Sequence, residues 1–237
     1  MAVYRSEIDS ERFGVCIARA ETVTGDLLPQ ILDDCSRAGV RMLIARCAGA
    51  DLPSLQAMER AGFLLMDAQV KYERRLVGPE AAGGALVRPL RPGDVGAVVA
   101  IARESFGGYA GHYHADQRLP RELCDEVYPS WASRCCSGEA ADHVVVAEVD
   151  GRVAGFSAFQ RLNEAEARLQ LGAVAPWARG HQLYTTLTFA GMAWCGEQRL
   201  SRMSAITQTT NLAAQQSWIR SGMMPVDAWY TFHRWFD

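Results

Sequence analysis

Residues 174–184, VAPWARGHQLY, join a strand-like stretch to an apolar segment that has the length of a helix. A loop that opens directly into a helix presents successive backbone N–H groups and the positive end of the helix dipole. Arg179 adds a guanidinium that can form charge-assisted hydrogen bonds. The stretch therefore indicates a binding site for a pyrophosphate, with an ordinary structural loop as the alternative.

Outward from this loop, the hydrophobic pattern alternates between the periods of strands and helices. Asp150-Gly151 between two apolar runs is typical of a hairpin turn. An irregular loop is expected to end near residue 119. The other elements expected after residue 85 are strands at 87–90, 143–149, 152–161, 167–174, 203–207 and 228–235, and helices at 94–106, 120–136, 183–196 and 212–221. This order predicts an α/β domain with a mixed sheet.

Residues 77–84, VGPEAAGG, are small and flexible and predict a linker. Before the linker, the patterns predict helices at 27–36 and 53–61, a buried strand at 41–47 and strands within 63–74. The predicted organisation is a smaller domain at 1–76, a linker at 77–84 and a larger domain at 85–237.

An internal repeat appears when the numbering is shifted by 160 residues. The identical pairs are Cys35 and Cys195, Leu52 and Leu212, Gln56 and Gln216, Gly62 and Gly222, Asp67 and Asp227, Ala68 and Ala228, and Arg74 and Arg234. Chance is the alternative, but the shift also aligns the order of the expected elements. We predict a degenerate duplication whose N-terminal copy is structural, because it has no equivalent of the loop at 174–184.

The composition favours a small-molecule substrate. The formal net charge is −3, and the interspersed charges show no basic patch for nucleic acid or an anionic membrane. The N-terminus carries charges where a secretory signal needs an apolar core, and no stretch approaches the length of a membrane span. The seven cysteines show no CxxC or CxxH spacing, so reduced thiols and a cytoplasmic location are expected.

Two motifs resemble those of the GNAT superfamily of acyl-CoA-dependent N-acyltransferases. Val174, Pro176, Arg179 and Gly180 fit its V-x-P-x-x-R-G run, and Asn211 begins its N-x-x-A signature. The resemblance implies the GNAT fold, a mixed and mainly antiparallel sheet flanked by helices, with a degenerate GNAT-like domain at the N-terminus. It also implies acetyl-CoA or another acyl-CoA as cosubstrate, no metal, and transfer of the acyl group to an amine.

The resemblance places the coenzyme on the loop and on the helix that Asn211 begins, although an ordinary helix N-cap is the alternative for Asn211. Gln182 and Tyr184 stand where the family has glycine or alanine, so two side chains must be accommodated near the phosphates. A backbone N–H near Val174 is expected to stabilise the oxyanion. The predicted coenzyme-binding residues are Val174, Arg179, Gly180, His181, Gln182, Leu183, Tyr184, Asn211 and Trp218.

Residues 162–168 and 207–211 resemble the bacterial TDP-fucosamine acetyltransferases, a GNAT group that also carries an extra N-terminal domain. This likeness implies a nucleotide-linked amino sugar as the acceptor and places Gln208 among the substrate-binding residues. Other small-molecule amines stay open as acceptors. The sequence does not fix the oligomeric state, and a homodimer is one option.

In that group a tyrosine seven residues after the asparagine protonates the departing thiolate of coenzyme A. Trp218 occupies this position (211 + 7), and an indole N–H donates hydrogen bonds but is not a usable acid. Tyr184 and Tyr230 are the alternative catalytic proton donors. The change also supports a second hypothesis, a catalytically lapsed domain that binds acyl-CoA or a sugar nucleotide.

Residues 107–116, GGYAGHYHAD, lie where the GNAT fold borders its acceptor site. His114 is the first choice for the catalytic base, because a neutral imidazole accepts a proton near pH 7. A polar surface segment is the alternative, and a metal site is less favoured because alternate residues of a loop need a distant third ligand. The substrate-binding residues predicted here are Tyr109, His112, Tyr113, His114 and Asp116, with tyrosines stacking on a ring and His112 and Asp116 ranked behind His114 as base.

Overall fold

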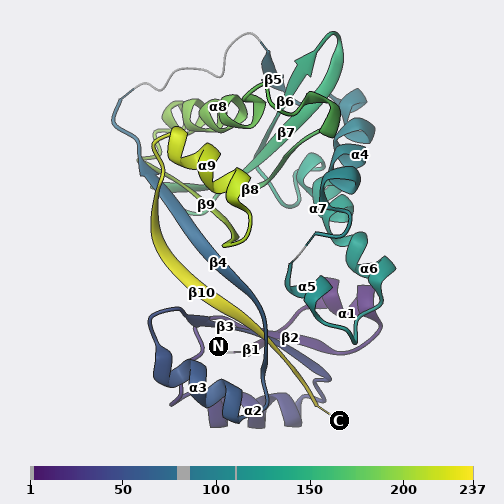
Figure 1. Ribbon diagram of the computed structural model, residues 1–237, viewed down its shortest axis with the longest axis vertical. Helices are drawn as coiled ribbons and strands as arrows, with labels where there is room; N and C mark the ends of the chain where they lie inside the picture. The colour runs from purple at the N-terminus through teal and green to yellow at the C-terminus, as the bar shows by residue number, and fades with distance from the viewer. Residues whose placement is uncertain (1–2, 79–85, 110, 237) are drawn as a thin grey trace. The chain divides into compact units, whose positions relative to one another are not determined.

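The computed structural model describes residues 3–78, 86–109 and 111–236, which form two compact units (Figure 1). Unit 1 consists of Met1–Val70, Ala110–Cys124 and Asp227–Asp237, and unit 2 consists of Lys71–Tyr109 and Asp125–Val226. Neither unit is one contiguous segment, in contrast to the predicted division into 1–76 and 85–237. Residues 79–84 of the predicted linker lie outside the described residues.

The sheet of unit 1 has the strand order β1-β2-β3-β10-β4. β1 and β2 are antiparallel, β2 and β3 are parallel, and β3 and β10 are antiparallel. The strands are β1 (Val3–Arg5), β2 (Ile17–Ala20), β3 (Met42–Ala48), β4 (Leu64–Arg75) and β10 (Met224–Trp235), the last two of which continue into unit 2. The helices are α1 (Glu7–Phe13), α2 (Leu28–Arg37), α3 (Leu52–Arg60), α5 (His112–Ala115) and α6 (Arg121–Asp125).

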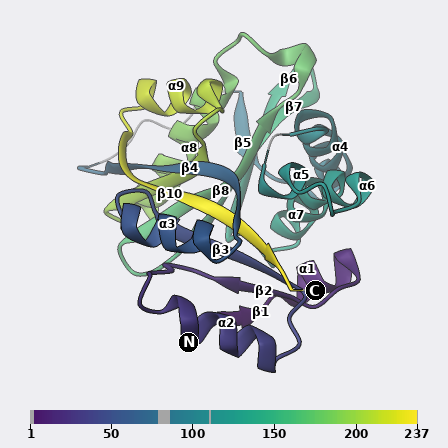
Figure 2. The same ribbon diagram turned by 60° about the horizontal axis from the view of Figure 1, so that its bottom comes forward.

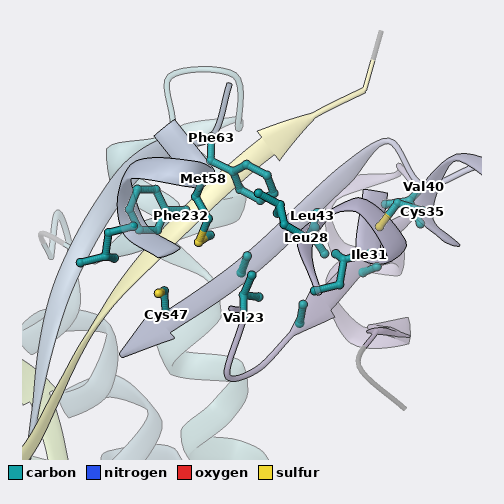
Figure 3. Packing of buried hydrophobic residues seen from close by; sticks show 14 residues of the cluster. Val23, Leu28, Ile31, Cys35, Val40, Leu43, Cys47, Met58, Phe63 and Phe232 are labelled. Atoms are coloured by element: carbon teal, nitrogen blue, oxygen red, sulfur yellow. The ribbon is translucent and has the colours of Figure 1, made fainter. Parts of the chain in front are cut away.

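The core of unit 1 forms where α2 and α3 pack on the sheet. Leu28, Ile31 and Cys35 recur at helical spacing and are buried on one face of α2. Phe232 of β10 lies among the core residues of the N-terminal elements (Figure 3). Burying a leucine or isoleucine side chain stabilises a fold by about 1.5–3 kcal/mol. The C-terminal strand is therefore part of the N-terminal core.

The sheet of unit 2 has the strand order β4-β9-β8-β7-β6-β5. The pairs β5–β6, β6–β7 and β7–β8 are antiparallel, whereas β8–β9 is parallel. The strands that begin and end in this unit are β5 (Val87–Pro89), β6 (His143–Val149), β7 (Arg152–Arg161), β8 (Glu166–Val174) and β9 (Arg202–Gln208). The helices are α4 (Val95–Phe106), α7 (Val127–Cys136), α8 (Leu183–Glu197) and α9 (Leu212–Arg220), with 3₁₀ turns η1 (Pro92–Asp94) and η2 (Pro176–Ala178). The predicted α/β class with a mixed, mainly antiparallel sheet flanked by helices is confirmed.

Helices cover both faces of the unit 2 sheet (Figures 1 and 2). On one face, Ile101 of α4 and Ala132 of α7 share a buried cluster with Phe156 of β7. On the other face, Trp194 of α8 stacks on His143 of β6 with ring centroids 5.1 Å apart. No helix among the described residues is long and apolar enough to cross a membrane.

Local chemistry explains where the structure departs from the expected elements. The predicted helix at 120–136 is two helices, because Pro129 lacks an N–H and fits only the first turn of a helix that restarts at Val127. The loop predicted to reach residue 119 contains the short helix α5. The last strand begins at Met224, four residues before the predicted start.

The two halves of the chain have exchanged their last strands. After a shift of 160 residues, β3, α3 and β4 have the same bounds as β9, α9 and β10. Nevertheless β10 pairs with β3 in unit 1, where Tyr230 is opposite Cys47, and β4 neighbours β9 in unit 2. The observed bounds thus extend the sequence repeat, and each unit contains a strand from the other half.

Candidate functional site

Strands β8 and β9 separate partway along their length. Their parallel ladder runs from Glu166 opposite Arg202 to Leu169 opposite Ala205 and then ends. β8 continues to Val174 and β9 to Gln208, so the last residues of both strands have no ladder partner on this side. Unpaired strand edges present backbone N–H and C=O groups to a ligand.

A β-bulge lies at the point of separation. On the other side of β8, Ala158 is opposite Leu171 and Phe159 is opposite Leu169, so Gln170 is the extra residue. A bulge bends its strand and redirects side chains, and bulges are frequent beside functional sites. The amide of Gln170 donates a hydrogen bond to Gln160 of β7. The bulge accounts for the divergence of β8 from β9.

The loop after β8 is a cradle of free N–H groups. The six successive backbone N–H groups from Gly180 to Thr185 donate to no backbone carbonyl within the described ranges. Gly180 has a φ of 90° and Gln182 a φ of 56°, so both adopt the left-handed conformation that curves the chain into α8. Free N–H groups at a helix N-terminus attract anions. The loop therefore has free N–H groups at a helix N-terminus, and the anion site at residues 174–184 stays a prediction.

The predicted loop residues lie on this cradle. Arg179, Gly180, His181 and Gln182 are exposed, whereas Leu183 is buried as the first residue of α8. No carboxylate among the described residues pairs with Arg179. An unneutralised guanidinium beside unpaired amides suits a phosphate group.

The corresponding region of unit 1 has no such opening. The N–H of Val23 donates to Arg46 of β3 over 2.8 Å, which closes the gap between the strands. At the start of α2, Leu28 donates to Thr24 over 3.1 Å, and the N–H of Gly25 donates to Ser54 over 2.8 Å. The N–H groups of Val23 and Gly25, the counterparts of two free groups in unit 2, are thus used within the fold of unit 1.

A polar cluster lies where β9 meets α9. The hydroxyl of Tyr109 donates to Gln208, and the Asn211 amide donates to Tyr109 over 3.2 Å and to Thr207 over 3.0 Å. The Asn211 oxygen accepts the N–H of Ala214 over 3.3 Å, so Asn211 is the N-cap of α9. The structure thus brings together Tyr109, Gln208 and Asn211, three residues predicted for the site. The cap of α9 is a structural role that accounts for the asparagine at position 211.

Tyr184 lies over β8 next to this region. A Cβ on Gly172 would come within 2.9 Å of the Tyr184 ring and 2.7 Å of the Ser157 hydroxyl. Burial, together with the neighbouring Tyr109 phenol, raises the pKa of Tyr184. Tyr184 is therefore neutral at pH 7, as a hydrogen-bond donor requires.

Trp218 is a buried indole with an unused donor. Its side chain is 1% exposed, and its Nε1 has no hydrogen-bond partner within the described part of the chain. Its ring centroid lies 5.6 Å from that of Tyr72 and 6.5 Å from that of Tyr184. The indole also acts on the Tyr184 phenol, whose pKa it lowers against the larger effect of burial.

Other predicted residues belong to unit 1. The His112 and His233 rings share a hydrogen bond of 2.9 Å between Nδ1 and Nε2, and His233 Nδ1 lies 2.7 Å from Asp116. Burial, followed by the charge of His233, lowers the pKa of His112 well below its ordinary value. Burial alone would raise the pKa of Asp116, but hydrogen bonds from His233, Trp235 and Arg118 lower it. These side chains form a buried polar chain within the unit.

Tyr113, His114 and Tyr230 also lie in unit 1. The Tyr113 hydroxyl donates to Asp9 over 2.7 Å and accepts from Arg19 over 2.5 Å. His114 is partly buried in α5, and Tyr230 packs against the hydrophobic core from β10. The predicted roles of these three residues in catalysis or binding stay predictions.

Several features of the site were not predicted from the sequence. Gly172, Gln170 and Thr207 contribute close packing, the bulge and a hydrogen bond. The glycine within the predicted strand at 167–174 was the available signal, because a strand glycine often marks close approach of another group.

Metal or thiol chemistry gains no support from the described residues. Within them, no three His, Cys, Asp or Glu side chains gather as a metal site. Burial raises the pKa of Cys136 to about 11 and that of Cys135 to about 12. Both thiols are therefore protonated at pH 7, as expected for cysteines that pack in a helix.

Comparisons with known proteins point to one family. The family model described as the acetyltransferase (GNAT) family matches residues 101–223. A GCN5-related N-acetyltransferase from Sphaerobacter thermophilus is similar in structure, with a TM-score of 0.66 and 15% identity over 99% of this chain and 76% of that chain. A search of curated proteins found no match.

Two further solved structures share the fold. One is a tandem GNAT protein from the clavulanic acid biosynthesis pathway, with a TM-score of 0.57 and 15% identity over 92% of this chain and 75% of that chain. The other is the N-myristoyltransferase of Saccharomyces cerevisiae with bound myristoyl-CoA, with a TM-score of 0.56 and 12% identity over 92% of this chain and 59% of that chain.

Proposed function

The chain belongs to the acetyltransferase (GNAT) family, and from this premise we propose that it transfers an acetyl group from acetyl-CoA to the amine of a nucleotide-linked amino sugar. Family membership establishes the coarser activity, acyl transfer from coenzyme A to an amine. The acetyl group, the acceptor and the roles of individual residues belong to the proposal.

The separation of β8 and β9, followed by the cradle of free N–H groups, carries the proposal. A thioester arm can lie against the unpaired strand edges while its diphosphate binds the amides from Gly180 to Thr185. Arg179 adds a positive charge at the diphosphate. These residues would hold the coenzyme, and it would supply the activated acyl group.

The reaction is a direct attack by the amine. The amine nitrogen forms a bond to the thioester carbonyl carbon, and the carbon–sulfur bond breaks to release the thiolate. In the tetrahedral intermediate the carbonyl oxygen carries a negative charge. An unpaired backbone N–H near Val174 stabilises this oxyanion. The attacking nitrogen loses a proton, and the thiolate gains one.

Tyr184 and Trp218 serve the departing thiolate as hydrogen-bond donors. The raised pKa of Tyr184 keeps its proton on the phenol, and an indole does not release its proton. A thiolate with an ordinary pKa of about 8.5 is a good leaving group without a strong acid. In this proposal the thiolate takes its proton from water.

The acceptor half of the proposal uses neutral polar groups and one base. Tyr109, Gln208 and Thr207 offer hydroxyl and amide groups that can bind the hydroxyls of a sugar. His114 is the proposed base, and Tyr230 stays an alternative proton donor to the departing thiolate. The sequence resemblance to amino-sugar acetyltransferases supports this acceptor class over other amines.

Thiol release from acetyl-CoA in the presence of a panel of nucleotide amino sugars and other small amines tests the proposal. We expect release that depends on the amine, and a kcat/KM for acetyl-CoA about tenfold lower in Arg179→Ala. Coenzyme binding without turnover on any amine would instead support the lapsed binding domain, which Trp218 in the tyrosine position favours. Failure to bind either coenzyme A or a sugar nucleotide would contradict both functions.

A further inference from the structure

Two histidines and an aspartate of unit 1 form one hydrogen-bonded chain. His233 of β10 lies in the middle: its Nδ1 is 2.7 Å from Oδ2 of Asp116, and its Nε2 is 2.9 Å from Nδ1 of His112. All three side chains are buried. Asp116 also accepts the backbone N–H of Arg118 and the indole N–H of Trp235, each over 2.9 Å. The aspartate end of the chain is therefore fixed in place.

The chain determines which nitrogen of each ring carries a proton. Burial alone would raise the pKa of Asp116, but its hydrogen bonds lower it, so Asp116 is a carboxylate at pH 7 and can only accept. His233 therefore donates from Nδ1, and its Nε2 accepts the Nδ1–H of His112. The Nε2 of His112 then carries no proton, and it has no hydrogen-bond partner among the described residues. The chain ends in a nitrogen with an unused lone pair.

Charged groups from three elements act on the His112 ring. Arg19 of β2 and Arg46 of β3 are two of them, and His114 of α5 is the third. Each arginine has its own carboxylate, because Asp9 pairs with Arg19 over 2.7 Å and Glu21 pairs with Arg46 over 3.3 Å. The carboxylate that bonds to the histidines is Asp116.

A proton that enters at His112 does not have to stay there. Burial, followed by the charge of His233, lowers the pKa of His112, so its imidazole is neutral at pH 7. When Nε2 of His112 takes up a proton, the proton on Nδ1 can pass to Nε2 of His233. The positive charge then lies beside the Asp116 carboxylate, and an opposite charge at this distance stabilises it.

The acceptor amine needs a base before it can attack. A primary amine is an ammonium at pH 7, because its ordinary pKa lies above 7 and is about 10.4 in lysine. An ammonium has no lone pair, so its nitrogen loses one proton before it bonds to the thioester carbon and a second one afterwards. His114 is the proposed base for the attacking nitrogen, and the earlier proton has no assigned acceptor.

We propose that His112 is a catalytic residue that takes this first proton at Nε2, and that His233 and Asp116 are positioning residues that share it. One N–H bond of the ammonium breaks, its electron pair stays on the nitrogen, and the proton bonds to Nε2 of His112. Water removes the proton from the chain after the product has left. This inference rests on the proposed function and deepens it, because it makes these three residues, called the proton relay below, a base for the acceptor.

The pH dependence of turnover tests the catalytic role of His112. In thiol release from acetyl-CoA with the amine of the panel that reacts fastest, His112→Gln should lower kcat at pH 7 by at least about tenfold. At about pH 9.5 much of the amine is already neutral, so the variant should recover to within about fivefold of the parent. The KM for acetyl-CoA should not change. A purely structural role of His112 would give a loss that high pH does not rescue.

Asp116→Asn tests the positioning residues, and it keeps the size of the side chain. Its amide can donate to Nδ1 of His233, which reverses both tautomers and places a proton on Nε2 of His112. Its kcat at pH 7 should fall as it does in His112→Gln, whereas Asp116→Glu, which keeps a carboxylate, should retain more activity. His143→Gln is the matched control, because it replaces a partly buried histidine outside every proposed site, and it should keep kcat at both pH values.

Nitrogen NMR of the full chain reports the tautomers without turnover. We expect protons on Nδ1 of His112 and His233 at pH 7, and a proton on Nε2 of His112 in Asp116→Asn. A proton on Nε2 of His112 in the unaltered chain would overturn the proton relay alone. Full activity of His112→Gln at pH 7, or a loss that persists at pH 9.5, would do the same. No turnover of the unaltered chain with any amine would instead overturn the proposed function.

Discussion

At Gly172 the packing of the site leaves no room for a side chain. A Cβ there would meet the Ser157 hydroxyl at 2.7 Å and the Tyr184 ring at 2.9 Å. Gly172→Ala should displace Tyr184 from β8, lower kcat/KM for acetyl-CoA at least tenfold and destabilise the fold by about 1–3 kcal/mol. Steady-state kinetics and urea unfolding measure the two effects.

Gly96 in α4 provides the matched control, because a Cβ added there meets no atom within 4 Å. Gly96→Ala should leave the kinetics unchanged and should not destabilise the fold, because alanine fits the first turn of a helix without strain. If Gly172→Ala keeps full activity, Tyr184 has no part in the transfer.

Asn211 caps α9 and also donates to a hydrogen-bond network. The substitution Asn211→Asp separates these two roles. Asn211→Asp keeps a capping oxygen but removes the amide that donates to Tyr109 and Thr207. Its free energy of unfolding should stay within about 0.5 kcal/mol of the parent, because asparagine and aspartate cap equally well. Its kcat/KM should fall, as coupled thiol-release assays can measure.

The counterpart of Asn211 in the first half is Asp51, which caps α3 by accepting from Ser54 over 3.2 Å. Asp51→Ala should lose about 0.5–2 kcal/mol of stability through the cap while kcat is retained. A fall in kcat for Asp51→Ala equal to that for Asn211→Asp would mean that the network at Asn211 has no specific role in the reaction.

Among the elements, the exchanged strands carry arginines that hold the ends of helices from the other half. Arg74 of β4 donates to the Ser221 carbonyl over 2.8 Å, and its counterpart Arg234 of β10 donates to Ala61. Arg74→Ala and Arg234→Ala should each destabilise the fold by about 1.5–3 kcal/mol, the range for hydrogen bonds to charged groups. Chemical denaturation gives these values, and the exposed Arg75→Ala should change stability by less than about 0.5 kcal/mol. An equally large loss of stability in Arg75→Ala would show that the hydrogen bonds of Arg74 and Arg234 contribute nothing specific to the stability of the fold.

The sequence predicts the elements well where patterns are long and local. The helices at 27–36 and 53–61 stand out by period and by their ends, and the helix beginning at Leu183 stands out by its long apolar run. β1 and β2 have three and four residues, too few to show a period, and were not predicted. The exchange of β4 and β10 left no signal, because each strand keeps the same alternation whichever partner it pairs with.

The candidate site also has features that the local sequence predicts and features that depend on strand pairing. The cradle at 174–184 could be predicted because left-handed glycine and a helix start are local properties of the chain. The separation of β8 from β9 depends on the register between strands, which no local pattern encodes. His112 and Asp116 bond to His233, which belongs to unit 1 only because β10 is exchanged. Their placement therefore could not be predicted before the strand order was known.

For the whole molecule, the buried chain from Asp116 to His112 makes stability depend on pH. The folded pKa of His112 is lowered, so the unfolded state binds more protons below its ordinary pKa of about 6.5. The free energy of unfolding should therefore fall as the pH falls below about 6.5, by up to about 1.4 kcal/mol per pH unit from this one group. Burial, His233, Arg19, Arg46 and His114 all act in this direction.

Urea unfolding between pH 7.5 and 5 measures this slope. His112→Gln should flatten it, and the exposed His181→Gln should leave it unchanged. The folded Asp116 contributes in a lower range, because its lowered pKa gives stability that is lost only below its ordinary value of about 3.9. An equal slope in His112→Gln and in the parent would assign the pH dependence to other groups.

The exchange of strands also determines the order in which the two units can fold during translation. During translation the N-terminal residues emerge first, yet β3 cannot pair with β10 until residues 224–235 have also left the ribosome. Unit 1 therefore cannot be completed before β10 has been synthesised, whereas β4 is available to unit 2 from an early stage. A premature stop just before residue 227 would remove the closing strand of unit 1. Loss of this strand would thus disturb the core that the N-terminal elements form.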